Sequence, residues 1–361
     1  MDEKDNSTKE IMDFQRRLVA WFHADKRDMP WRSDPSPYRV WVSEVMLQQT
    51  RVDTVIPYFN RFIERLPTVE DLAEVEEGEL MKLWEGLGYY SRVRNMQTTA
   101  REIVDDHGGE FPRTALELRK FKGIGAYTAG AVASIAFDDK AAAVDGNVFR
   151  VMARLTANHG DLRDLKVQKE LTREVERVLP DESVGDFNQA LIELGALVCI
   201  SKGSPKCPVC PVISYCEANR LGIQDILPYK SKAKEKTVEE KTVFLIQCGD
   251  RFAIRQRPKE RLLGGLFELP NVPGFLTPEE AAEVLTEWEL GILSVTMMKP
   301  AKVLFTHIQW NLRGLHIVVE KEAGDLVWAT REEALKSYAF ASAFSFYLSG
   351  MEGPEQLSLL L

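Results

Sequence analysis

The sequence predicts a two-domain protein, in which an all-α domain with a metal-binding loop precedes a mixed α/β domain. Apolar residues recur at helical spacing from Thr8 to about Arg220, and four of the five cysteines lie within 18 residues near the end of that region. After a charged segment, Tyr229 to Glu240, apolar and polar residues alternate as they do in strands. The length of 361 residues and the 45% apolar content suffice for two hydrophobic cores.

The first region contains Pro and Gly residues at intervals, and these mark the ends of helices. About ten helices and few strands are expected between them. The interruptions lie at Met29-Pro30, Leu66-Pro67, Gly86 to Gly88, His107 to Pro112, Gly123 to Gly125 and Leu179-Pro180.

The region after the charged segment is expected to form strands and one helix. The segment YKSKAKEKTVEE has no apolar face, so it is interpreted as a linker. Four period-two or β-branched runs follow, with a helical stretch from Thr277 to Leu290. The predicted strands are residues 242–248, 251–257, 265–270 and 301–320.

The charge and the N-terminus limit the function classes. A net charge of −9 argues against a protein that coats nucleic acid by bulk electrostatics, although a local basic face is compatible with it. The N-terminus, MDEKDNSTKE, is charged, and no run approaches the roughly 20 apolar residues of a membrane span. We expect a soluble protein without membrane contact, located in the cytoplasm.

The four clustered cysteines predict a metal site. Their spacing is C-x7-C-x2-C-x5-C, and a reducing compartment favours metal ligation over disulfides. Four thiolates are the ligand set of a [4Fe–4S] cluster or of an all-cysteine zinc site, and the spacing leaves both open. Unligated thiols are a third alternative, but a loop rich in Ser, Gly and Pro offers them little apolar burial. The candidate ligands are Cys199, Cys207, Cys210 and Cys216.

Gly123 and Gly125 indicate a tight turn between two helices. Such a turn exposes backbone amides at the start of the second helix, where a phosphate can bind. An ordinary helix connection would show the same Gly-x-Gly pattern. The pattern gains weight because Val144-Asp145-Gly146-Asn147 follows about twenty residues later.

These motifs together carry a family resemblance. The runs FKGIGAYTAGA and AVDGNVFRV and the cysteine loop resemble the helix-hairpin-helix DNA glycosylases of the endonuclease III superfamily. The runs PWR, WVSEVMLQQTRV and WEGLGYYSRVRN are similar to those of MutY-type adenine DNA glycosylases. The resemblance implies a helix-hairpin-helix glycosylase domain at 8–222 with DNA between two lobes, a six-helix lobe at about 31–136 and an iron–sulfur lobe at about 8–30 and 137–222.

The same resemblance implies catalytic roles for Glu44, Tyr127, Asp145 and Asn147. Glu44 shares a helical face with Trp41, and desolvation should raise its proton affinity, so that it can protonate adenine at N7. Asp145 would stabilise the cationic sugar. The alternatives are that Glu44 is a solvated helix residue and that Asp145 only caps a helix. Lyases of the superfamily have lysine where this chain has Tyr127, so we expect base removal without strand cleavage.

Further residues acquire binding roles from the resemblance. Gln49 and Tyr89 would act as wedges that fill the gap left by a flipped adenine, and Arg27, Trp31 and Gln189 would lie near the adenine pocket. Core packing is the alternative for Trp31 and Tyr89. The expected DNA-binding and base-binding residues are Arg27, Trp31, Arg32, Gln49, Thr50, Leu87, Tyr89, Ser91, Gly123, Gly125, Gln189, Phe305, Thr306 and His307.

The second domain, residues 241–361 after a linker at 223–240, resembles the Nudix (MutT)-like fold. RPKERLLGGLFELPN is similar to the lead into a Nudix box, but TPEEAAEVLTEWELG lacks the order of an Arg-Glu and paired glutamates that holds Mg²⁺. In the family, a Phe-Ser-His loop reads 8-oxoguanine opposite adenine. This chain has Phe305-Thr306-His307, which keeps a hydroxyl and adds a methyl group. The first cysteine spacing is also one residue longer than is usual in the family.

The leading hypothesis is a monofunctional glycosylase of base excision repair that removes adenine opposite 8-oxoguanine or guanine. Its cofactor would be a [4Fe–4S] cluster and its partner double-stranded DNA, bound by a monomer associated with a bacterial-type nucleoid. The alternatives are an endonuclease III-like enzyme for oxidised pyrimidines, a non-catalytic lesion-binding protein, and a nucleotide pyrophosphatase centred on the C-terminal domain.

Overall fold

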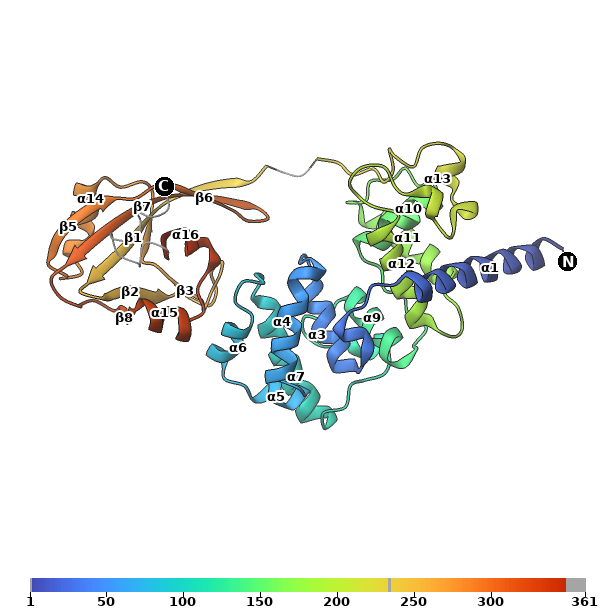
Figure 1. The fold of residues 1–361 in the computed structure, drawn as a ribbon, viewed down its shortest axis with the longest axis horizontal. Helices are drawn as coiled ribbons and strands as arrows, with labels where there is room; N and C mark the ends of the chain where they lie inside the picture. Colours follow the sequence, from blue (N-terminus) through green and yellow to red (C-terminus); the bar gives the residue numbers. More distant parts are fainter. Residues whose placement is uncertain (1, 233–234, 349–361) are drawn as a thin grey trace. The chain divides into compact units, whose positions relative to one another are not determined.

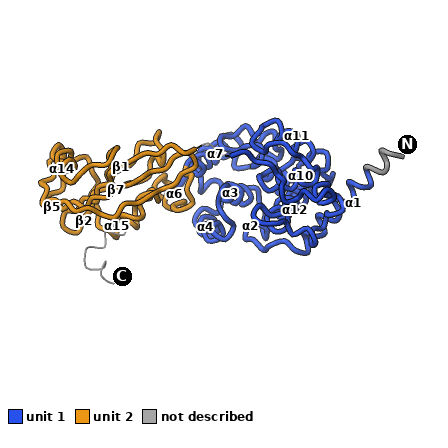
Figure 2. Tube along the Cα trace, turned by 90° about the horizontal axis from the view of Figure 1, so that it is seen from above, with its two compact units in different colours: residues 1–75, 91–232 blue, residues 76–90, 233–361 orange. Residues whose placement is uncertain are grey.

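The computed structural model describes residues 2–232 and 235–348, which form two compact units (Figure 1). The first unit contains the chain up to Val75 and the stretch Ser91–Lys232, and the second contains Glu76–Tyr90 and the chain after Lys232 (Figure 2). The predicted six-helix lobe, residues 31–136, therefore includes a 15-residue segment that packs with the C-terminal unit.

The first unit is helical in the residues that the structure describes, as the apolar spacing predicts (Figure 1). Its α-helices are α1 (Asp2–Asp25), α2 (Pro30–Ser33), α3 (Pro37–Leu47), α4 (Val52–Arg65), α5 (Val69–Glu74), α7 (Ser91–His107), α8 (Ala115–Leu118), α9 (Ala126–Phe137), α10 (Gly146–Leu155), α11 (Leu165–Arg177), α12 (Val184–Leu197) and α13 (Glu217–Arg220). The 3₁₀ turns η1 (Cys207–Val209) and η2 (Ile213–Tyr215) lie in the cysteine loop.

Helix α4 illustrates how the sequence sets these elements. Its buried residues Val55, Phe59 and Phe62 recur every three or four positions, so they form one apolar stripe. The helix ends at Arg65. This end is expected because Pro67 disfavours the helical conformation in the residue before it, Leu66. Thr68 starts α5 with a reciprocal capping box.

A second apolar stripe builds the core of the part that carries the cysteine loop. Phe14, Leu18 and Phe22 of α1 are buried against residues of α10, α11 and α12. Small residues let the backbones approach closely here. A Cβ atom on Gly195 of α12 would lie 2.6 Å from the Cβ of Asn147 on α10, so a larger residue would displace α10.

The second unit is built on a mixed sheet, in agreement with the period-two pattern. Strand β1 runs parallel to β7, and the other pairs are antiparallel. The main strand order is β3-β2-β1-β7-β5, with β4 on β1, β6 on β7 and β8 on β2. The strands are β1 (Thr237–Cys248), β2 (Arg251–Gln256), β3 (Phe267–Glu268), β4 (Asn271–Pro273), β5 (Ile292–Met297), β6 (Ala301–Leu304), β7 (Ile308–Val319) and β8 (Val327–Thr330).

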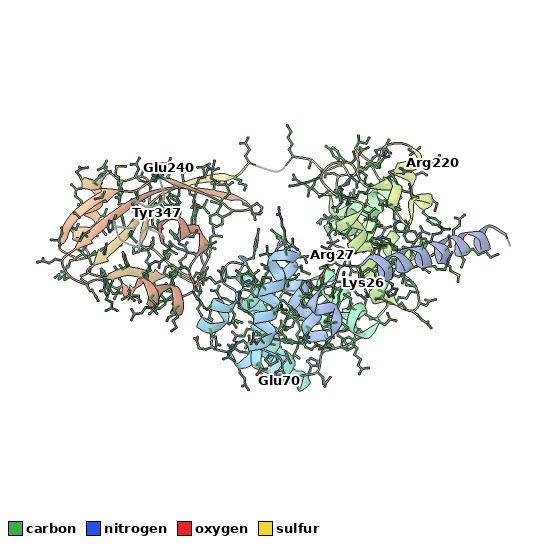
Figure 3. The ribbon with its side chains drawn as sticks, in the orientation of Figure 1. Lys26, Arg27, Glu70, Arg220, Glu240 and Tyr347 are labelled. Atoms are coloured by element: carbon green, nitrogen blue, oxygen red, sulfur yellow. The ribbon has the colours of Figure 1, made fainter. Side chains whose placement is uncertain are left out.

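Short helices accompany the sheet, and one of them comes from the N-terminal part of the sequence. Phe244, Leu285 and Leu315 contribute to the core that α14 shares with the strands. Tyr347, labelled in Figure 3, is buried next to Gly314 of β7, where a Cβ would lie 2.3 Å from its ring. The helical elements are α6 (Glu77–Leu83), α14 (Pro278–Thr286), α15 (Arg331–Ser337), η3 (Ser342–Phe344) and α16 (Ser345–Leu348).

Two predicted boundaries in this unit are wrong. Strand β1 begins at Thr237, inside the predicted linker, because its backbone pairs with β7 from Thr237 to Gln247 while its first side chains stay largely exposed. Helix α14 stops at Thr286 rather than at the predicted end, Leu290. Glu289 and Gly291, on either side of Leu290, have positive φ angles, which do not continue an α-helix. None of the helices described here is both long and apolar enough to cross a lipid bilayer.

Candidate active site

Most of the predicted site residues of the first unit line one cleft of about 1620 Å³. Helices α2, α3, α9, α10 and α12 and the turn before α9 supply its walls. Lys26 and Arg27, labelled in Figure 3, follow α1 and line it as well. The sequence-predicted residues in this cleft are Arg27, Trp31, Arg32, Glu44, Gln49, Thr50, Gly123, Gly125, Tyr127, Asp145, Asn147 and Gln189.

Glu44 is a buried carboxyl group at the wall of the cleft. Its exposed fraction is 7%, so the alternative of a solvated helix residue is wrong. The pKa of Glu44 is raised to about 7, chiefly by burial and to a smaller extent by the charge of Asp145, while a hydrogen bond from Tyr127 opposes the rise. The Tyr127 hydroxyl donates that bond to Oε2 at 2.6 Å. Glu44 is thus held in one orientation and protonated in an appreciable fraction of molecules near neutral pH.

Asp145 caps a helix and also faces the cleft. Its Oδ1 accepts hydrogen bonds from the backbone N–H groups of Asn147 and Val148, both at 2.8 Å, and its Oδ2 accepts one from the Asn147 amide at 2.7 Å. Burial raises the pKa of Asp145 above its usual value, and these bonds and the nearby Arg150 offset only part of that rise. The helix N-terminus and the three donors therefore stabilise a carboxylate inside a partly apolar site.

Arg150 fixes the orientation of Asn147, which donates a hydrogen bond to Asp145. Its Nη2 donates to Asn147 Oδ1 and to the carbonyl of Gly195, and its Nε donates to the carbonyl of Cys199, all at 2.8 Å. The orientation of Asn147 is therefore tied to α12 and to the start of the cysteine loop. Sequence reasoning missed this residue, although it stands at the end of the GNVFR run.

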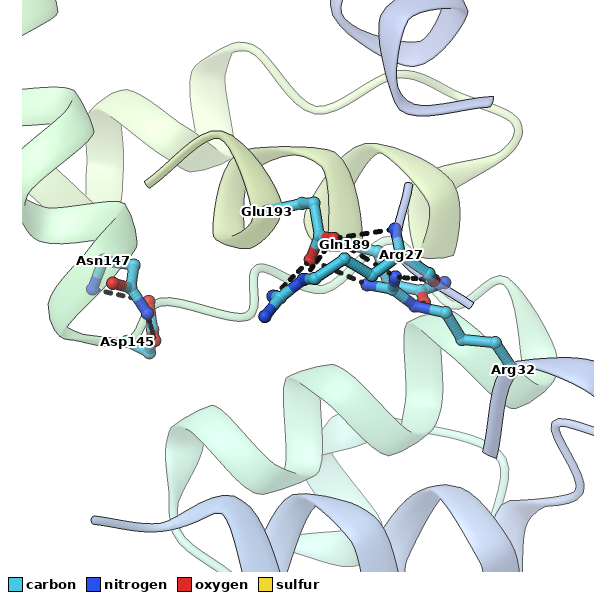
Figure 4. Close-up of polar contacts among 6 residues, drawn as sticks. All are labelled: Arg27, Arg32, Asp145, Asn147, Gln189 and Glu193. Carbon is cyan, nitrogen blue, oxygen red and sulfur yellow. Dashed lines mark hydrogen bonds and ion pairs between the residues drawn. The ribbon is translucent and has the colours of Figure 1, made fainter. Parts of the chain in front are cut away.

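A second polar group in the cleft centres on Glu193, which the sequence analysis also missed. Glu193 is 1% exposed, and both of its oxygens accept bonds of 2.8 Å from Arg27 (Figure 4). Arg32 donates to Glu193 at 3.1 Å and to Gln189 at 3.2 Å. Burial raises the pKa of Glu193, but the hydrogen bonds and charges of the two arginines outweigh this effect and hold the pKa at about 2. A glutamate within the apolar run ALIELG was the available signal.

The turn between α8 and α9 has the predicted geometry. Gly123 has a φ of +82°, and a Cβ there would lie 2.7 Å from the Cβ of Asn95. Gly125 is the N-cap of α9, is exposed and would accommodate a Cβ in open space. The exposed Gln49 also has a positive φ, of 60°, just after α3. Both turns therefore contain a residue in the left-handed backbone region, which glycine adopts most easily.

The four cysteines of the loop line one small pocket with apolar walls. Burial raises the pKa of Cys210 to about 12, so its sulfur binds a metal only in exchange for a proton. In the described ranges, no three Cys, His, Asp or Glu side chains converge as they would on one metal ion. Four thiol groups at one pocket are a donor set that fits a [4Fe–4S] cluster and equally an all-cysteine zinc site.

The remaining predicted residues do not line this cleft. Ser91 starts α7 and lines a smaller cavity of about 130 Å³. Leu87 and Tyr89 belong to the second unit, where Leu87 is buried and Tyr89 is 46% exposed, so core packing is wrong for Tyr89. Trp31 packs edge-on against Phe59, so it serves the core as well as the cleft.

The Phe305-Thr306-His307 loop connects β6 to β7 in the second unit. Thr306 and His307 are exposed. The ring of Phe305 packs edge-on against that of the buried Trp310, with 4.8 Å between the ring centroids. The Thr306 hydroxyl lies 2.7 Å from the hydroxyl of Tyr89. A predicted wedge residue and a predicted base-reading residue thus share a hydrogen bond.

Comparisons with known proteins agree with this architecture. Residues 42–177 match the HhH-GPD superfamily of base excision DNA repair proteins, and residues 242–349 match the NUDIX domain. The chain is 43% identical to an adenine DNA glycosylase of Homo sapiens, covering 95% of this chain and 76% of the relative. It is 33% identical to that of Rattus norvegicus, covering 94% and 78%, and 35% identical to one from Buchnera aphidicola, covering 72% and 74%.

Two solved structures resemble the helical part. A thermostable thymine-DNA glycosylase aligns with a TM-score of 0.54 and 28% identity, covering 60% of this chain and 99% of that one. A trapped covalent intermediate of endonuclease III with DNA aligns with a TM-score of 0.50 and 27% identity, covering 60% and 98%. Both support the predicted fold class of the first domain.

Proposed function

The chain belongs to the adenine DNA glycosylase family, and from this premise we propose that it releases adenine from DNA where the adenine stands opposite 8-oxoguanine or guanine. The enzyme acts in base excision repair. The observation that carries the chemistry is the buried Glu44, whose pKa is raised to about 7, in the same cleft as a hydrogen-bonded Asp145.

Glu44 acts as the general acid. Its protonated carboxyl group gives a proton to N7 of the extruded adenine, and this makes the base a better leaving group. As the bond between C1′ and N9 breaks, its electron pair goes to the base and a positive charge develops on the sugar. The carboxylate of Asp145, held by Asn147, stabilises that charge until water adds to C1′ and gives up a proton to the solvent.

The product is an intact abasic site, because the residue in the lyase position is Tyr127. Its hydroxyl group binds Glu44 and has no amine with which to form a Schiff base. This argues against an endonuclease III-like lyase for oxidised pyrimidines. Burial and proximity to Glu44 raise the pKa of Tyr127, so it remains a neutral donor to the acid.

Recognition divides between the two units. Arg27, Arg32 and Gln189 offer hydrogen-bonding groups around the adenine, and Trp31 offers a ring for stacking. The N–H groups at the turn before α9 bind a phosphate. Gln49 and Tyr89 fill the gap, and the Phe305, Thr306 and His307 loop reads the opposite base. The further DNA contacts are Thr50, Leu87, Ser91, Gly123 and Gly125.

The cofactor is a [4Fe–4S] cluster held by Cys199, Cys207, Cys210 and Cys216. When bound, it supplies a covalent cross-link between the end of α12 and the loop before α13. Lys202 lies exposed in that loop, where it can contact phosphate. Double-stranded DNA is the macromolecular partner, and the enzyme acts as a monomer associated with a bacterial-type nucleoid.

The test is adenine release from a duplex with adenine opposite 8-oxoguanine, under single-turnover conditions. Glu44→Gln and Asp145→Asn should each lower the rate by roughly 10²-fold or more, since each removes a group that acts in the transition state. DNA binding should persist. If Glu44→Gln released adenine at the wild-type rate, the enzyme would use another acid. If no variant changed and the wild type released nothing, the non-catalytic lesion-binding alternative would stand.

A further inference from the structure

The segment Glu76–Tyr90 belongs to the N-terminal part of the sequence but packs with residues that come more than 140 positions later. It lies between helices of the first unit along the chain, yet it packs as part of the second unit (Figure 2). It contains α6 and ends in the exposed wedge residue Tyr89. The contacts that hold this segment therefore determine where the wedge lies within the C-terminal unit.

Lys82 of α6 provides the first contact. Its ammonium group donates to the carbonyl oxygen of Leu335 at 2.5 Å and to that of Tyr338 at 3.1 Å. Both carbonyls lie at the C-terminal end of α15, where a helix leaves acceptors without partners and favours a positive charge. The same ammonium group pairs with Glu85 at 2.5 Å.

Glu85 provides the second contact. Its Oε1 accepts a hydrogen bond of 2.8 Å from the backbone N–H of Phe340. The chain on either side of Phe340 is pinned to β3, because Phe267 donates to the carbonyl of Ala339 at 2.8 Å and accepts from Ala341 at 2.9 Å. The Glu85 carboxylate is therefore bound to a strand of the sheet through one short segment.

The stretch from Glu85 to the wedge is internally braced. The indole N–H of Trp84 donates to the carbonyl of Gly88 at 3.1 Å, and the N–H of Gly86 donates to the hydroxyl of Tyr90 at 3.2 Å. Trp84 and Tyr90 are buried, and Tyr89 has a positive φ of 46°. A non-glycine residue keeps that conformation only where its surroundings impose it.

We propose that Lys82 and Glu85 are positioning residues that set the Tyr89 wedge against the Thr306 loop. The pair fixes one end of the braced stretch to α15 and β3, and the bond between Tyr89 and Thr306 fixes the other. Reading of the opposite base and insertion of the wedge then depend on one rigid assembly. This inference rests on the proposed function of adenine release opposite 8-oxoguanine.

The test compares Glu85→Ala with Glu85→Gln and with a matched control, Lys259→Met. Lys259 pairs with Glu77 of α6 at 2.7 Å, but the Lys259 side chain is 63% exposed, so the control should leave the rate unchanged. Glu85→Ala should lower the single-turnover rate opposite 8-oxoguanine by about tenfold or more, since small misplacements cost large factors. Glu85→Gln keeps an oxygen for the Phe340 N–H and should recover part of the rate.

A double-mutant cycle with Tyr89→Ala separates positioning from general destabilisation. If Glu85 acts through the wedge, Glu85→Ala should cause no further loss in the Tyr89→Ala background. Independent, multiplicative losses would overturn the inference, as would equal rates for Glu85→Ala and wild type. Should Glu85→Ala not fold, as judged by thermal unfolding, Lys82→Met serves in the same cycle. A wild-type enzyme that releases no adenine refutes the proposed function instead.

Discussion

Burial of Glu44, the proposed catalytic acid, costs stability, and Glu44→Gln should recover that stability. The pKa of Glu44 is raised from 4.5 to about 7 by burial in the cleft wall. Below pH 4.5 the carboxyl group is protonated in both the folded and the unfolded chain. As the pH rises towards 7, the unfolded chain loses this proton first, so the folded state loses relative stability.

The size of the effect follows from the same pKa. At about 1.4 kcal/mol for each pH unit, a rise from 4.5 to about 7 corresponds to roughly 3 kcal/mol at pH 8. Glutamine has a similar shape, can accept the Tyr127 hydrogen bond and does not ionise. The variant should thus match the wild type at pH 4.5 and exceed its free energy of unfolding by about 2–3 kcal/mol at pH 8.

The assay is urea unfolding of both proteins at pH 4.5 and at pH 8, followed by tryptophan fluorescence. Glu64→Gln, on the exposed face of α4, is the control and should change neither value by more than about 0.5 kcal/mol. The reasoning would be refuted by a stability difference between Glu44→Gln and wild type that is the same at both pH values. A variant that is less stable than wild type at pH 8 would refute it as well.

Three further predictions test the rest of the site. Tyr127→Phe removes the bond that lowers the pKa of Glu44, so the loss of adenine-release rate at alkaline pH should move to a higher pH; an unmoved rate profile would contradict this. The purified protein should be brown with broad absorption near about 400 nm, and a colourless protein with stoichiometric zinc would exclude the cluster. Thr306→Ala should reduce the preference for 8-oxoguanine over guanine by about tenfold in single-turnover rates, while Thr306→Ser should retain it, because only alanine lacks the hydroxyl.

Elements with a strong apolar period could be predicted from the sequence. The spacing of apolar residues and the Pro and Gly interruptions predicted the helical region, and the cleft unites most of the residues of the first unit that the motifs nominated, including Glu44 and Asp145. The start of β1 was not predictable in this way. Its first residues are charged and largely exposed, and the strand exists there because β7 supplies backbone partners.

Contacts between distant parts of the chain also could not be predicted from the sequence. Nothing in the run WEGLGYY shows that its segment packs beside α15, since the ammonium group of Lys82 binds backbone carbonyls that carry no sequence signature. Glu193 and Arg150 were missed for a related reason. Each is a single charged residue within an apolar stretch, and its importance is apparent only when its partners are known.

The close approach of α12 to α10 widens the set of positions at which an inherited or engineered change can silence the enzyme. Adding one methyl group at Gly195 would push on Asn147, the residue that holds the Asp145 carboxylate. A screen restricted to DNA-contacting residues would overlook this position. Sequence redesign of the helical core should therefore keep Gly195 fixed together with the proposed catalytic residues.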